Sequence, residues 1–86
     1  MPAIPTLHLN GTGINGFRDG LVKVHSTLRN AIEALCQAAP HGRDYYVQGP
    51  DAYNVARNEH DARVEKLTSV LREITEIWEG IQEQER

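Results

Sequence analysis

Two long stretches of the chain repeat apolar residues at helical spacing, and this pattern constrains the fold more than any other feature of the sequence. Within residues 13–39, apolar positions recur every seven residues in two sets offset by three. The sets are Ile14, Leu21, Leu28 and Leu35, and Phe17, Val24, Ala31 and Ala38. Such a stripe predicts a helix that packs along another helix. His25 lies beside the stripe and is expected to face solvent.

A second helix is predicted over residues 50–80, with Pro50 at its first position and Asp51 beside it. Its apolar stripe steps by four and three through His60, Val64, Leu67, Leu71, Ile74, Trp78 and Ile81. We interpret His60 as a core histidine because it lies on this stripe. Gly80 is expected to end the helix, which leaves residues 81–86 as a frayed tail.

Together with the segments around them, the two predicted helices indicate one all-α domain, a helical hairpin of two long antiparallel helices. Residues 1–12 begin extended because they contain two prolines, and residues 40–50 form the connection between Pro40 and Pro50. Residues 6–9 alternate weakly like a strand, but the chain offers no partner strand. Thr12 and Asn15 are the candidate N-caps of the first helix.

The apolar face of the second helix predicts self-association. Val70 and Ile77 flank the main stripe, so the face is wider than one neighbouring helix covers. We therefore expect a homo-oligomer in which hairpins form an antiparallel helical bundle. The alternative is a monomer whose N-terminal segment packs over the hairpin through Ile4, Leu7 and Leu9.

Composition argues against several classes of protein. One cysteine among 86 residues forms no internal disulfide, and the histidines have no metal-site spacing, so neither metal nor cofactor is expected. No apolar run predicts a membrane span or a signal peptide, which favours a cytoplasmic protein. No nucleophile–base pair or carboxylate dyad is visible, so we expect no enzyme.

The charge distribution argues against binding to DNA or RNA. The chain carries 9 basic and 12 acidic residues, and the acidic ones concentrate in residues 44–86. That half would repel a phosphate backbone, and no cluster of lysine and arginine lies along one face.

The connection holds the strongest candidate site. Residues 41–46 read HGRDYY, which places a guanidinium, a carboxylate and two rings in a row at Arg43, Asp44, Tyr45 and Tyr46. Arginine binds phosphate or carboxylate through forked donors, and tyrosine stacks on bases. Arg57, near the start of the second helix, is a further candidate. In the alternative interpretation, Arg43 and Asp44 cap the helix ends while the tyrosines fill the end of the hairpin.

Asn10, Gly11 and Thr12 form a second candidate, next to the start of the first helix. Backbone N–H groups at such a position bind anions, although a simple turn explains the same residues. The two motifs lie at opposite ends of one helix, about 35–40 Å apart. They share a ligand only if the N-terminal segment runs back along the bundle or if two chains pack antiparallel.

The two motifs, with GlnGlyPro at 48–50 and the Ala-Arg-Glu-His residues of 56–60, resemble a family of small proteins of tailed bacteriophages and prophages. The family pattern has asparagine before Gly42, where this chain has His41. The resemblance implies a phage accessory protein of the bacterial cytoplasm.

Phages make small helical oligomers that sequester nucleotide signals of host immunity, and this chain is similar in size and expected architecture. We therefore expect a small anionic nucleotide as the ligand, held without catalysis. The alternative is an interaction factor that binds a host or phage protein through the tyrosines or the acidic second helix.

Overall fold

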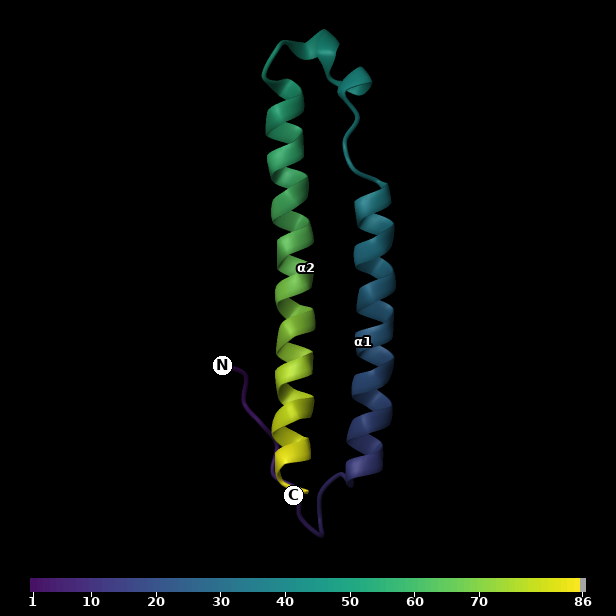
Figure 1. The fold of residues 1–86 in the computed structure, drawn as a ribbon, viewed down its shortest axis with the longest axis vertical. Coiled ribbons are helices and arrows are strands. Elements are labelled where there is room, and N and C mark those ends of the chain that lie inside the picture. The colour runs from purple at the N-terminus through teal and green to yellow at the C-terminus, as the bar shows by residue number, and fades with distance from the viewer. Residues whose placement is uncertain (86) are drawn as a thin grey trace.

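The computed structural model describes residues 1–85 and is an antiparallel hairpin of two long helices (Figure 1). Helix α1 spans Ile14–Gln37 and helix α2 spans Ala52–Glu83. Two short 3-10 turns, η1 (Gly42–Asp44) and η2 (Tyr46–Gln48), form most of the connection between them. No strand occurs in residues 1–85. The all-α hairpin is thus confirmed, with extents of 62 × 21 × 19 Å.

The predicted stripe of α2 is the face that the structure covers. His60 and Ile81 are buried, and the five stripe residues between them are half-buried. Val70, on the flank, is 45% exposed. His60 is therefore a core histidine, as its position on the stripe predicts.

The predicted stripe of α1 is confirmed for its first set, Ile14, Leu21, Leu28 and Leu35, which are all half-buried, but its second set differs after Phe17. Val24, Ala31 and Ala38 are exposed, whereas His25 and Ile32 are half-buried. A strict repeat of seven residues drifts by about 20° per heptad around a straight helix. The face toward α2 therefore moves forward along the sequence by one residue. The expectation that His25 faces solvent was wrong for this reason.

Helix α1 begins and ends without side-chain caps. Its N-cap is Gly13, in an extended conformation and with no side-chain hydrogen bond, so neither Thr12 nor Asn15 is the cap. Asn15 instead accepts a hydrogen bond from Arg18. At the other end, the N–H of Ala38 donates to the carbonyls of Ala34 and Leu35 at 3.1 Å.

The ends of α2 differ from the prediction at both termini. The helix begins at Ala52, two residues after Pro50, with Asp51 as its N-cap. It then runs past Gly80 to Glu83, and Ile81 has no exposed surface at all. The prediction of a frayed tail was therefore wrong for residues 81–83. Arg86, the last residue of that tail, lies outside the described residues.

The N-terminal segment folds back along α2, so that the N-terminus lies beside the C-terminal part of this helix, whereas the C-terminus lies at the open end of the hairpin (Figure 1). The side chain of Gln84 binds the backbone of Pro5 and Leu7, and Leu7 is half-buried. Leu9, in contrast, is fully exposed. Packing of this segment over the hairpin is therefore observed for Leu7 but not for Leu9.

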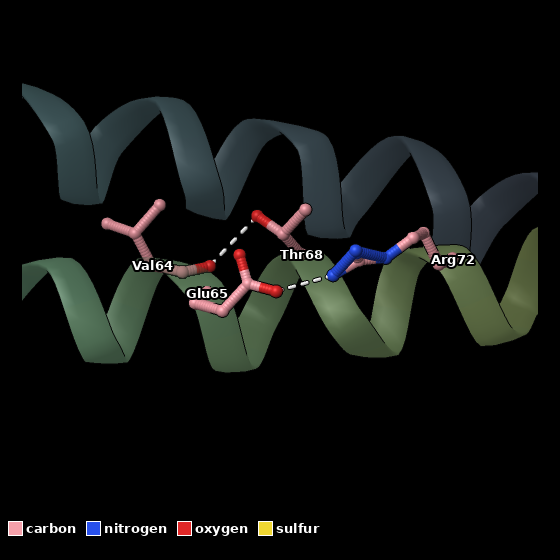
Figure 2. Close-up of polar contacts among 4 residues, drawn as sticks. All are labelled: Val64, Glu65, Thr68 and Arg72. Carbon is pink, nitrogen blue, oxygen red and sulfur yellow. Dashed lines mark hydrogen bonds and ion pairs between the residues drawn. The ribbon is translucent and has the colours of Figure 1, made fainter.

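Polar side chains along α2 are satisfied locally. The hydroxyl of Thr68 donates to the carbonyl of Val64 at 2.9 Å, and Arg72 pairs with Glu65 at 2.5 Å (Figure 2). Both members of the ion pair are more than half exposed, so the pair contributes little to stability. The packed face of the hairpin therefore depends on its apolar residues.

Within residues 1–85, neither helix has the length and apolar character that a membrane span requires.

Candidate functional site

The backbone of the connection is a series of hydrogen-bonded turns. Nδ1 of His41 accepts a hydrogen bond from the N–H of Arg43 at 3.2 Å and so caps η1. The N–H groups of Asp44 and Tyr45 donate to the carbonyls of His41 and Gly42 at 3.0 and 3.1 Å. These short-range bonds give Arg43 and its neighbours defined backbone positions at the closed end of the hairpin.

Glycine is required where the connection meets α2. Gly49 has a φ of +125°, a conformation that residues with a side chain rarely adopt. The N–H of Gly49 donates to the carbonyl of Tyr46 at 3.4 Å, which closes η2. The conformation of the last turn before α2 therefore depends on glycine at position 49 as well as on these hydrogen bonds.

The candidate side chains of the connection point mostly into solvent. Arg43 and Asp44 are exposed, and within residues 1–85 neither side chain has a hydrogen bond or an ion pair. Tyr46 is 74% exposed, whereas Tyr45 is half-buried. The interpretation that Arg43 and Asp44 cap helix ends was therefore wrong. Filling the end of the hairpin remains an explanation for Tyr45, but not for Tyr46.

Arg57 belongs to a separate groove on the side of the hairpin. Its Nη1 donates to the hydroxyl of Tyr53 at 3.2 Å, and its Nε lies 4.0 Å from Oδ2 of Asp61. The hydrogen bond to Tyr53, and then the charge of Asp61, raise the pKa of Arg57 above its usual value. The guanidinium is thus charged at any physiological pH.

The groove beside Arg57 has a volume of about 270 Å³ and lies between the end of α1 and the first turns of α2. Its lining includes Cys36, Pro40, Tyr53, His60 and Asp61. None of the candidate side chains of residues 43–46 lines it. The sequence had allowed a polar pocket shared by Arg57 and Arg43, but Arg43 does not line this groove.

Asn10, Gly11 and Thr12 form an exposed turn at the open end of the hairpin. The N–H of Gly11 donates to the carbonyl of His8 at 3.2 Å. The methyl group of Thr12 packs over Gly16, since a Cβ there would lie 2.9 Å from it. This turn and the connection lie at opposite ends of the molecule (Figure 1). One chain therefore does not bring the two motifs together.

Sequence reasoning missed an apolar groove between the helices. About 300 Å³ in volume, it is lined by residues that include Leu21, Val22, His25, Ile74 and Trp78. Val22 belongs to neither predicted stripe and is 57% exposed. The helical drift that brings His25 inward is the signal that would have revealed this groove. In residues 1–85, no cluster of three or more histidine, cysteine or acidic side chains could hold a metal ion.

Comparison of the chain with protein-family models, with curated proteins and with solved structures finds no match.

Proposed function

We propose that the protein binds and sequesters a small anionic nucleotide signal of host immunity, without catalysis. The observation that carries this proposal is the pairing of an unpartnered guanidinium with an exposed ring. Arg43 is exposed with no polar partner in residues 1–85, and the neighbouring Tyr46 is 74% exposed. Arginine binds phosphate through forked, charge-assisted hydrogen bonds, and tyrosine stacks on a base.

The proposed site is completed by a second copy of the chain. A two-fold axis perpendicular to the long axis of the hairpin would place the turn at residues 10–12 of one copy beside the connection of the next. The N–H groups at the start of α1 would then face the phosphate, whereas the N–H of Gly11 in that turn already donates to the carbonyl of His8. Arg43, Asp44, Tyr45 and Tyr46 of one copy and Asn10, Gly11 and Thr12 of another form this proposed site. Arg57 would contribute its charge from the neighbouring groove.

Two features of the hairpin support assembly into a helical-bundle oligomer. The chain exposes 6549 Å² of surface, whereas a compact monomer of 9.7 kDa exposes about 5,100 Å². The apolar groove that contains Trp78 lies open on this surface. Covering such a groove with a second hairpin would remove apolar area from water, which is the main driving force of association.

The first prediction concerns the mass of the protein in solution. We expect native mass spectrometry and light scattering at tens of micromolar to give the mass of two or more chains of 9.7 kDa. A single species at the mass of one chain would contradict the assembly and, with it, the two-copy site.

The second prediction tests the ligand. At 100 times its dissociation constant, the correct nucleotide should stabilise the fold by about 2.7 kcal/mol. In a domain of this size, that corresponds to a rise in Tm of at least about 10 °C. A thermal-shift screen against cyclic and linear nucleotides measures it, and calorimetry should then give a stoichiometry that is a simple fraction of the subunit number. No shift and no heat from any nucleotide would contradict the proposal.

A second function, binding to a host or phage protein, is favoured by a different observation. Tyr46, Val47 and Val55 are apolar or aromatic and are 74%, 76% and 56% exposed near the closed end of the hairpin. Exposed apolar residues that gather in one place mark interaction surfaces. A stoichiometric protein partner in a pull-down, combined with the absence of any nucleotide signal, would select this function. Under either function, the resemblance to phage proteins supports a role in the bacterial cytoplasm.

A further inference from the structure

The last turn of α2 binds an extended piece of the chain through its backbone. Oε1 of Gln84 accepts a hydrogen bond from the N–H of Leu7 at 2.8 Å, and Nε2 of Gln84 donates to the carbonyl of Pro5 at 2.7 Å. In an extended segment, a carbonyl and an N–H two residues apart point to the same side. The side-chain amide of Gln84 therefore takes the place of the N–H and C=O that a single residue of a neighbouring parallel strand would supply.

Gly80 provides the place where Ile4 lies on α2. A Cβ on Gly80 would lie 2.9 Å from two side-chain carbons of Ile4, closer than real Cβ contacts come. Gly80 and Gln84 are four residues apart and so lie on the same face of the helix. Gly80, which lacks a side chain, and the side-chain amide of Gln84 together form a surface that residues 4–7 contact. We call this surface the seat.

The seat adjoins the most completely buried side chain of the protein. Ile81 has no exposed surface, whereas Leu71 and Ile74, which lie between the two helices, are only half-buried. Two helices alone leave their contact residues partly open, so a third element must cover Ile81. The N-terminal segment is the element that contacts both Gly80 and Gln84.

We propose that the seat formed by Gly80, Ile81 and Gln84 is a binding site for an extended peptide backbone, and that residues 4–7 occupy it as a detachable strap. The attachment includes two hydrogen bonds, the contact of Ile4 and the half-buried side chain of Leu7, while Met1 and Leu9 on either side are fully exposed. One hydrogen bond, from Gly11 to His8, closes the turn that follows. The strap and this turn open together as a unit, and their opening uncovers Ile81.

Glycine-to-alanine substitutions in the full-length protein separate this proposal from ordinary helix stability. Alanine in place of a helical glycine normally raises Tm by about 4–8 °C in a domain of this size. Gly20→Ala is the matched control, because nothing lies within 4 Å of its Cβ position. We expect Gly20→Ala to raise Tm by this amount. We expect Gly80→Ala not to raise Tm, because its new methyl group displaces Ile4.

Amide hydrogen exchange then reports the strap directly. We expect exchange at Leu7 and Gly11 to accelerate together, at least tenfold, in Gly80→Ala and to stay unchanged in Gly20→Ala. Equal gains in Tm with unchanged exchange would overturn the proposal. Acceleration at Leu7 alone would overturn the claim that the strap opens as a unit.

A second pair of variants tests the amide without adding bulk. Gln84→Glu keeps an acceptor for Leu7 but faces the carbonyl of Pro5 with a second acceptor. Gln82→Glu changes the charge equally in the same turn, and the Gln82 side chain makes no hydrogen bond to the strap in residues 1–85. We expect faster exchange at Leu7 in Gln84→Glu only. The same exchange rate in both variants would show that Gln84 does not hold the strap.

Discussion

Leu71→Asp is expected to unfold the hairpin. Leu71 lies half-buried on the stripe of α2 and, with Ile32 of α1, lines a groove between the helices. The substitution removes apolar contact and puts a charge beside apolar side chains, at a cost of about 3–5 kcal/mol. A domain of this kind has a total stability of about 5–15 kcal/mol, and small ones lie at the low end. Circular dichroism should show most of the helical signal lost, or a urea midpoint lowered by more than half.

Val70→Asp is the control that separates folding from assembly. Val70 directly precedes Leu71 on α2, but it is 45% exposed in the hairpin. The same new charge should therefore leave the helical signal of the single chain intact. If copies associate through this flank, Val70→Asp should lower the mass measured by light scattering. A Leu71→Asp protein as stable as Val70→Asp would show that Leu71 is not part of the core.

The two helices could be predicted because their signal is local and repeated many times. Every stripe residue of α2 from His60 to Ile81 is buried or half-buried, as its spacing predicts. In α1, the set from Ile14 to Leu35 is half-buried as predicted, whereas the second set leaves the packed face after Phe17, since a repeat of seven drifts around a straight helix. Val24 and His25 exchange places as a result.

The end of α2 could not be predicted from local pattern at all. Glycine disfavours helix by about 1 kcal/mol, so Gly80 reads as a terminator. Its role depends on Ile4, which is distant in sequence and touches the backbone of α2 only because Gly80 has no side chain. Gln84, in a stretch expected to fray, likewise binds Pro5 and Leu7. Contacts between residues almost eighty positions apart carry no periodic signal.

The candidate site, like the helices, could be predicted only in part. That HGRDYY is the connection, at the end of the hairpin, follows from Pro40 and Pro50. Its internal hydrogen bonds, with His41 as the cap of η1, depend on backbone angles that the residue types do not determine. That this motif and residues 10–12 lie far apart was predicted from helix length alone, and Figure 1 shows them at opposite ends of the hairpin. Whether a second copy joins the two motifs stays a prediction.

Arg43→Ala is expected to remove most nucleotide affinity and to leave the fold unchanged. The guanidinium has no polar partner within residues 1–85, so its loss breaks no hydrogen bond or ion pair of the hairpin. Charge-assisted hydrogen bonds are worth about 1.5–3 kcal/mol each. The loss of one or two such bonds to a phosphate should weaken binding by about 10- to 20,000-fold. Calorimetry measures the affinity, and Tm should stay within about 2 °C of the original protein.

Arg63→Ala is the matched control, because it removes the same charge from an exposed position on α2. A general effect of net charge would weaken binding equally in both variants, whereas a site at the connection predicts a loss only for Arg43. Tyr46→Leu adds a test of stacking: it keeps an apolar side chain but removes the ring, and should weaken binding about 5- to 150-fold. If Arg43→Ala instead lowers Tm by 10 °C or more, the connection is a structural end of the hairpin, and the ligand lies elsewhere.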